Sequence, residues 1–237
     1  MKLSNAIANT ADFEFAALRE AKNYRAALLE EFGAHLYGNV LEVGCGIGQI
    51  TEELLRLPGI EELVSIEPDA TFCERLRSRL PEHRVIQGTI SDIDTHQPWN
   101  AIISINVLEH IESDLQELVN YCELLRPARG VLCLFVPSRP EIYAPIDRDF
   151  GHFRRYTRAE LKAKLREAGF DVLRIRYYNL IGYFLWYLNF KVLKKRAFDL
   201  NAVRLFDRAI FPLIHKLEAR ICAPPIGQSL IVVAIPK

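Results

Sequence analysis

The chain has 237 residues, of which half are hydrophobic and a quarter are charged. This composition is typical of a globular protein with a substantial core, and it excludes collagen-like, coiled-coil and disordered chains. Thirty basic side chains balance thirty acidic ones. The molecule as a whole therefore lacks a positive field, and we expect no nucleic acid partner.

The cysteines and the amino terminus indicate the compartment. The five cysteines are an odd number without a Cys-x-x-Cys pair, which predicts reduced thiols rather than a disulfide framework or a zinc site. The first residues lack the apolar run of a secretory signal. The most apolar stretch, 177–193, is interrupted by polar residues and is too short to cross a bilayer. We therefore expect a cytoplasmic protein.

Hydrophobic patterns predict alternating helices and strands along most of the chain. Residues 12–36 have the apolar spacing of one or two helices, which would form an amino-terminal cap over 1–38. Short apolar runs then predict seven strands, at 39–43, 63–66, 84–87, 101–105, 131–136, 172–177 and 230–235. The segments between the first strands are long enough for crossover helices. This alternation predicts an α/β fold with a doubly wound, mostly parallel, Rossmann-like sheet.

Several helix boundaries are marked by capping residues or by proline. Ser113–Gln116 and Thr157–Glu160 have the pattern of capping boxes. Before the last strand, residues 179–225 form an insertion with two helical segments, 181–196 and 201–221, and Pro212 predicts a kink or break in the second. From Lys191 to Arg220 the insertion carries eight basic and three acidic residues, a net charge of +5.

The most informative motif is the glycine loop after the first strand, Glu42-Val43-Gly44-Cys45-Gly46-Ile47-Gly48. Its Gly-x-Gly-x-Gly spacing differs from the Gly-x-Gly-x-x-Gly of dinucleotide sites, which disfavours a nicotinamide-dependent oxidoreductase. Glu42 is placed to accept hydrogen bonds from an ammonium group or to order the loop amides. Glu67 ends the next strand, where a carboxylate can accept both hydroxyls of a ribose.

With Ile66-Glu67-Pro68, segment 85–90 and Ile105–Ile111, this loop resembles the class I S-adenosylmethionine-dependent methyltransferases, from about residue 24 to the carboxyl terminus. The resemblance implies a methyltransferase domain over 39–237 with the seven-stranded fold of that class. It also implies S-adenosylmethionine as methyl donor and S-adenosylhomocysteine as product. The implied cofactor residues are Glu42, Gly44, Cys45, Gly46 and Gly48 near the methionine part, Glu67 and Pro68 at the ribose, Gly88, Thr89 and Ile90 at the adenine, and Asn106 and Val107 near the sulfonium. Thr89 departs from the family, which often has an aspartate there.

The acceptor side is expected at the loop after the fifth strand, because parallel sheets bind ligands at the carboxyl ends of their strands. Residues 139–156 are dense in polar and aromatic groups and would form a lid. We nominate His152 as a general base, with Tyr143 and Tyr156 as positioning groups. Alternatively, His152 and Arg155 only fasten the lid, by pairing with Asp147 or Asp149.

Two further residue groups have simpler interpretations. His110 fits a structural turn better than a catalytic role. No metal is expected, because no compact set of carboxylates recurs at ligand spacing beyond Asp92 and Asp94, which fit a surface turn.

The function predicted is transfer of a methyl group to a small-molecule, glycan or lipid-linked acceptor, at a hydroxyl oxygen. A catalytically inert relative that serves as a binding or regulatory subunit is the alternative. The aromatic and basic segment 181–196 favours peripheral contact with an anionic membrane. A helix that covers the core or forms a homodimer would have the same pattern.

Overall fold

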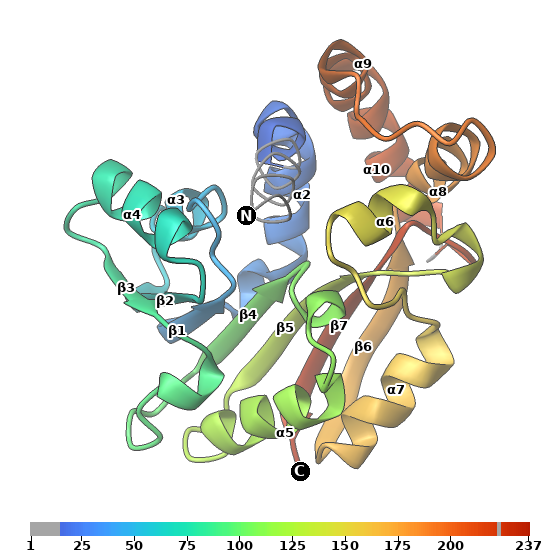
Figure 1. Ribbon diagram of the computed structural model, residues 1–237. Helices are drawn as coiled ribbons and strands as arrows, with labels where there is room; N and C mark the ends of the chain where they lie inside the picture. The colour runs from blue at the N-terminus through green and yellow to red at the C-terminus, as the bar shows by residue number, and fades with distance from the viewer. Residues whose placement is uncertain (1–14, 222–223) are drawn as a thin grey trace.

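The protein is built around one seven-stranded sheet with the strand order β3-β2-β1-β4-β5-β7-β6 (Figure 1). The computed structural model describes residues 15–221 and 224–237, so residues 12–14 of the expected first helix and Cys222 lie outside the described residues. The strands are β1 (Gly38–Val43), β2 (Ile60–Glu67), β3 (Arg84–Gln87), β4 (Ala101–Ile105), β5 (Val131–Pro137), β6 (Phe170–Tyr178) and β7 (Ser229–Pro236). Strand β7 runs antiparallel to both of its neighbours, β5 and β6, and the other adjacent pairs in this sheet are parallel. The predicted fold class is confirmed.

The central strands are apolar on both sides because helices cover both faces of the sheet. On β4, Ile102 points into one hydrophobic cluster, while Ala101 and Ile103 point into the other. Successive side chains of a strand face opposite sides, so a strand buried on both faces has a continuous apolar sequence. All seven residues of β5 are buried for the same reason.

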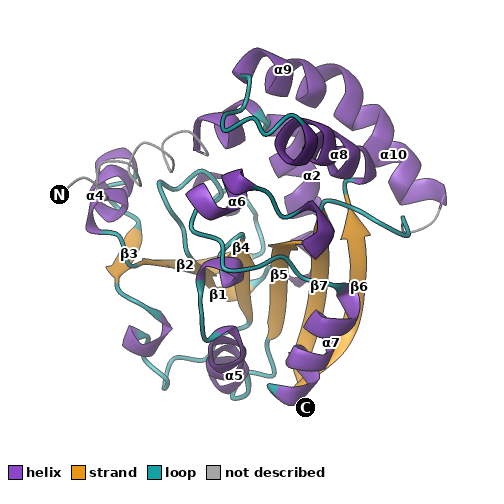
Figure 2. Ribbon diagram, turned by 45° about the vertical axis from the view of Figure 1, so that its right-hand side comes forward, coloured by secondary structure: helices purple, strands orange, loops and turns teal. Residues whose placement is uncertain are grey.

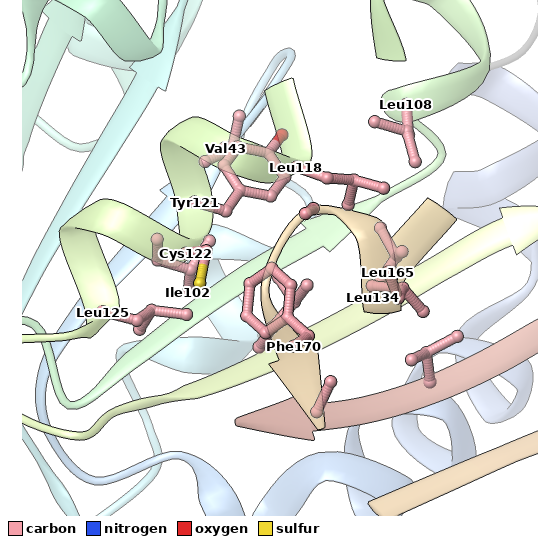
Figure 3. Packing of buried hydrophobic residues seen from close by; sticks show 14 of the residues in the cluster. Val43, Ile102, Leu108, Leu118, Tyr121, Cys122, Leu125, Leu134, Leu165 and Phe170 are labelled. Carbon is pink, nitrogen blue, oxygen red and sulfur yellow. The ribbon is translucent and has the colours of Figure 1, made fainter. Parts of the chain in front are cut away.

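Helices α5 (Asp114–Leu125) and α7 (Arg158–Glu167) pack on one face. Figure 3 shows Leu118, Tyr121, Cys122 and Leu125 of α5 directed toward the sheet, close to Leu165 of α7. On the opposite face, α2 (Lys22–Phe32) and α10 (Phe211–Ile221) contribute to the second cluster.

The remaining α-helices have ten residues or fewer. They are α3 (Thr51–Leu54), α4 (Ala70–Arg79), α6 (Pro145–Asp149), α8 (Leu180–Trp186) and α9 (Leu200–Leu205), with 3₁₀ turns η1 (Gly33–His35), η2 (Ile90–Asp92), η3 (Leu108–His110) and η4 (Pro140–Ile142). Helices α6, α8 and α9 lie together at one end of the sheet in both views (Figures 1 and 2). Residues 15–20 are also helical and are separated from α2 at Ala21. Among the four described cysteines, none forms a disulfide.

The helical insertion contains two wide turns. Helix α8 continues as the π-helix η5 (Tyr187–Val192), and α9 continues through the π-helix η6 (Phe206–Ile210) into α10. Of the kink or break expected at Pro212, a break is absent, since α10 follows η6 directly and contains this proline in its first turn. Proline cannot donate to the preceding turn, and the wider turn is one way to accommodate it. In the described part of the chain, every helix is too short or too polar to cross a bilayer.

The two expected capping boxes differ in the structure. Both helices begin where predicted, but only the Thr157 side chain accepts a hydrogen bond, from the Glu160 amide at 3.1 Å. Ser113 makes no such bond, so the box predicted there is wrong. The ψ of Ser113 is 54°, outside the extended region in which a capping side chain reaches the first-turn amides, whereas that of Thr157 is 154°.

This contrast gives a matched pair of substitutions. Thr157→Ala should lower the free energy of unfolding by about 0.5–2 kcal/mol, because it removes the cap of α7. Ser113→Ala should change it by less than about 0.5 kcal/mol. Urea unfolding measures both values, and equal losses for the two variants would contradict the capping difference.

Candidate active site

A cavity of about 650 Å³ opens at the carboxyl ends of β1, β2 and β4. Loops after these three strands form its floor, and Phe15 and Phe150 reach it from the amino-terminal helix and from the end of α6. Among the expected cofactor residues, the cavity is lined by Glu42, Gly44, Cys45, Gly46, Glu67, Pro68, Asn106 and Val107. The other expected cofactor residues, Gly48, Gly88, Thr89 and Ile90, do not line this cavity.

The glycine loop follows a path that other residues rarely adopt. Gly44, Gly46 and Gly48 have φ values of 72°, 53° and 83°, in the left-handed region that favours glycine. A Cβ atom on Gly44 would lie 2.3 Å from Cγ2 of Val107, and one on Gly46 would lie 2.8 Å from the Phe15 ring. Bare backbone is therefore required for the turn and for the close approach of its neighbours.

Glu67 connects the tip of β2 to this loop. Its Oε2 accepts the amide hydrogen of Gly46 at 2.9 Å, and its Oε1 accepts that of Asp69 at 3.0 Å. The side chain is buried at the cavity wall, and burial raises the pKa of its carboxyl group. Each carboxylate oxygen can accept a further hydrogen bond, so the position suits a ligand with two adjacent hydroxyls.

Glu42 lies near the end of β1, just before the glycine loop, and is bonded by hydroxyls of two neighbouring elements. Its Oε2 accepts hydrogen bonds from the hydroxyls of Thr51 at 2.7 Å and Ser65 at 2.6 Å. Burial raises the pKa of Glu42 from 4.5 to about 7. Glu42 also lines the cavity, and these hydroxyl contacts test neither of the roles expected for it, binding an ammonium group or ordering the loop amides.

The segment expected at the adenine lies beside the cavity. Thr89 caps η2, and Asp92 Oδ2 accepts from the Thr89 amide at 2.8 Å and from its hydroxyl at 3.3 Å. The Thr89 hydroxyl is thus used within its own turn, and Ile90 packs in the core. Of the two aspartates expected in a surface turn, Asp92 performs this capping and Asp94 accepts from the His96 amide.

The lid is organised around Asp147, which is fully buried. Its Oδ1 lies 3.1 Å from Nδ1 of His152 and accepts from Nε of Arg155 at 2.7 Å. The Tyr143 hydroxyl donates to the carbonyl oxygen of His152 at 2.7 Å. These contacts are those of a fastened lid, with Asp147 rather than Asp149 as the anchor. Asp149 pairs instead with Arg196 of the insertion.

Tyr156 does not line the cavity. Its ring is fully buried in the core cluster, and its hydroxyl donates to Oδ2 of Asp114 at 2.9 Å. The backbone bridge between Ser138 and Tyr156 directs the ring beneath the lid. The expected contact of Tyr156 with an acceptor is therefore absent. His152 and Tyr143 likewise lie behind the cavity lining.

The turn after β4 brings in two residues that the sequence interpretation set aside. His110 lines the cavity, and its ring meets that of His152 edge to face, with the centroids 4.7 Å apart. Burial lowers the pKa of His110 to about 3, so the imidazole is neutral at ordinary pH. Glu109 is fully buried, with Oε1 3.9 Å from Nε2 of His152. The sequence signal that could have indicated these two residues was a Glu-His pair in the turn that follows a central strand.

The family is decided by comparison with known proteins. A family model described as a methyltransferase domain matches residues 13–175, more than half of the chain. The chain belongs to this methyltransferase family. It is a class I S-adenosylmethionine-dependent methyltransferase, as the resemblance of the glycine loop and Glu67 predicted. That membership supports an enzyme over the inert subunit.

Solved structures share the methyltransferase's fold at low identity. An S-adenosylmethionine-dependent methyltransferase from Clostridium acetobutylicum ATCC 824 is 10% identical, with a TM-score of 0.58 over 91% of this chain and 92% of that chain. The complex of DhpI with SAH is 16% identical, with a TM-score of 0.61 over 99% of this chain and 94% of that chain.

One curated relative matches over a shorter region. The mitochondrial ubiquinone biosynthesis O-methyltransferase of Dictyostelium discoideum is 26% identical over 108 residues. The match covers 39% of this chain and spans about a third (33%) of that relative's length.

The cavity fits the cofactor of this family. A loop whose glycines expose bare backbone on one wall and a carboxylate with two acceptor oxygens on the other suit an adenosyl amino acid that carries no phosphate. Glu67→Ala should weaken binding of S-adenosylhomocysteine by about 1–3 kcal/mol, because it removes hydrogen bonds to a charged group. Isothermal titration calorimetry measures the loss. Glu61→Ala, at the exposed end of the same strand, is the control. Equal affinities for both variants would contradict the role of Glu67.

Glu42 makes stability depend on pH. Its folded-state pKa lies above the unfolded value, so its contribution is fully present below about pH 4.5 and is lost as the pH rises through about 7. Glu42→Gln keeps one oxygen for both hydroxyl donors. Between these pH values, the unfolding free energy of the wild type should fall relative to the variant by on the order of 1–3 kcal/mol. Urea unfolding across this range measures the difference, and parallel curves would contradict it.

Proposed function

We propose that this methyltransferase methylates a hydroxyl oxygen of a small-molecule, glycan or lipid-linked acceptor. The observation that carries the proposal is a pair of imidazoles at the cavity wall: His110 lines the cavity, and its ring meets that of His152 edge to face, with the centroids 4.7 Å apart. A hydroxyl must lose its proton to attack a methyl group, and imidazole is a common acceptor for that proton. The partial similarity to an O-methyltransferase supports the same atom.

The cofactor supplies the methyl group on a sulfonium together with its own leaving group. The chain must then align the acceptor and exclude water. Glu42 and the glycine loop would hold the methionine part, Glu67 and Pro68 the ribose, and Asn106 and Val107 the region of the reacting atoms. Gly88, Thr89 and Ile90 would bound the adenine once the ligand enters.

His152 would act as the base, placed beside the cavity wall by its edge-to-face contact with His110. Asp147 next to Nδ1 favours the tautomer that keeps the hydrogen on that nitrogen, which leaves the Nε2 lone pair facing Glu109 and His110. Tyr143 holds the backbone at His152, so it would position the pair rather than the acceptor.

The helical insertion supports a lipid-linked acceptor and peripheral contact with a membrane. The inner side of α8 and η5 packs on the lid, where Trp186 and Phe190 join Ile142 and Ile146 in one hydrophobic cluster. Its other side exposes large apolar residues beside basic ones. The exposed apolar residues of the insertion are Phe184, Leu185, Tyr187, Leu188, Val192, Leu193, Leu205, Ile210, Leu213 and Leu217.

This exposed surface is linked to the cavity. Asp149 and Phe150 line the cavity, while Asp149 pairs with Arg196 and the Phe150 ring stacks on Phe198. A net charge of +5 over Lys191–Arg220 favours an anionic bilayer as the surface that the apolar side chains enter. The protein would then be cytoplasmic and peripheral at the membrane. A homodimer through the same surface is the competing arrangement.

The acceptor atom is tested by methyl transfer to matched compounds. Purified protein and methyl-labelled S-adenosylmethionine are incubated with phenols, sugars and a polyprenol-linked sugar, and with the corresponding amines and thiols. Label recovered on oxygen is expected. Transfer to nitrogen or sulfur alone would contradict the proposal.

His152→Ala should lower kcat about 10²–10⁴-fold and leave the affinity for S-adenosylhomocysteine unchanged, as expected for a general base. The pH dependence of kcat should also lose its acidic limb. Phe153→Ala, at the exposed neighbouring position, is the control. A loss of less than about tenfold would leave His152 with the lid-fastening role only.

Membrane contact is tested by flotation of the full chain with phosphatidylglycerol and phosphatidylcholine vesicles. We expect binding to the anionic vesicles that decreases with salt and with Leu188→Glu or Lys194→Glu, both on exposed positions of 181–196. No flotation, together with a dimer that Leu188→Glu dissociates in sedimentation, would assign the surface to a homodimer instead.

A further inference from the structure

Three side chains with metal-binding atoms converge at the edge of the cavity. Glu109 and His110 come from η3 after β4, and His152 comes from the lid. One ligand atom from each lies within 4.8 Å of the others. Such a separation allows a single cation to bind all three after small rotations of the side chains.

The backbone brings these residues together from two distant loops. Asn106, with a φ of 53°, turns the chain out of β4 into η3. The amide of Phe153 donates to the carbonyl oxygen of Glu109 at 2.8 Å, and the amide of His152 donates to that of Asp147 at 2.9 Å. The lid is therefore joined to η3 beside the cluster, and the geometry does not depend on side chains alone.

The residues behind the cluster orient it for metal binding. Asp147 contacts Nδ1 of His152 at 3.1 Å and is itself bound by Arg155 at 2.7 Å. A carboxylate on the outer nitrogen is the usual support of a metal-binding histidine, because it fixes the ring and the tautomer. Nε2 of His152 then faces Oε1 of Glu109, 3.9 Å away.

We propose that Glu109, His110 and His152 bind one divalent transition-metal cation, such as Zn²⁺ or Mn²⁺. One carboxylate and two imidazoles form a ligand set that these ions favour over Ca²⁺ or Mg²⁺. Because His110 lines the cavity, a cation held by these residues would be accessible to an acceptor in that cavity. The sequence criteria, carboxylate spacing and Cys-x-x-Cys pairs, do not cover three residues that two distant loops bring together.

The cation would activate the acceptor hydroxyl for methylation, and this inference rests on the proposed function. A hydroxyl oxygen bound to the cation loses its proton to water more easily. The oxygen then forms a bond to the methyl carbon as the carbon–sulfur bond of the donor breaks, and the sulfur keeps the electron pair. In this arrangement the two histidines hold the cation, and the cation takes over the activation otherwise assigned to His152.

Metal binding is tested on full-length protein treated with chelator, without cofactor or acceptor. Titration of ZnCl₂ and MnCl₂ by calorimetry should show one saturable site. Glu109→Gln and His110→Ala should each weaken it at least about tenfold, and Asp147→Asn should weaken it about 10–100-fold. Glu112→Gln and His96→Ala, at exposed positions, should leave it unchanged.

Loading with Co²⁺ provides a readout independent of activity. A visible absorption band is expected from mixed nitrogen and oxygen ligands, and it should disappear in His110→Ala. Circular dichroism and the affinity for S-adenosylhomocysteine establish that each variant is folded. Absence of saturable binding, or binding that survives both Glu109→Gln and His110→Ala, would overturn the proposal.

The outcomes separate the two proposals. Metal binding at these residues without methyl transfer to any oxygen would refute the proposed acceptor but retain the site. Undiminished methylation of oxygen after chelation would refute the metal and retain the acceptor.

Discussion

The close approach of two loops at the centre of the sheet is the constraint on which the rest of the structure depends. Val107, after β4, packs directly against Gly44, after β1, because no Cβ stands between them. Strands β1 and β4 are adjacent, with β2 on one side and β5 on the other, so their loops diverge in opposite directions above this contact. In open parallel sheets, the crevice at such a reversal is where ligands bind. Glu67 closes one wall of the crevice by holding the Gly46 amide.

The lid and the insertion are held by a second, polar centre. Asp147 is buried with His152 and Arg155, and the Arg155 guanidinium lies 4.4 Å from the centroid of the Trp186 ring. A buried carboxylate is costly unless it is paired, so this arrangement fixes the lid in one conformation. The same contacts place α8 beside the cavity. Asp147 therefore contributes, through Arg155 and Trp186, to the position of the exposed apolar surface relative to the cavity.

The local parts of this structure could be predicted from sequence. Apolar runs located the strands, and the glycine spacing with Glu67 pointed to the family, because each depends on neighbouring residues only. Positions that depend on tertiary contacts were less accessible. Tyr156 has the composition of a site residue, yet a bridge to Ser138 turns it into the core. Ser113 has the capping residue type without the backbone angles, and Pro212 is accommodated by a wide turn.

The candidate site shows the same limit. Helix α5, strand β5 and helix α6 separate Glu109 and His110 from His152 in the sequence, and the folded lid brings the three residues together.

A crystal structure with S-adenosylhomocysteine would test the central claim most directly. We expect the ribose hydroxyls to contact Glu67 and the amino acid part to lie over Gly44–Gly48. The sulfur should face the space in front of His110. A ligand bound elsewhere, or one that leaves Glu67 without contact, would contradict it.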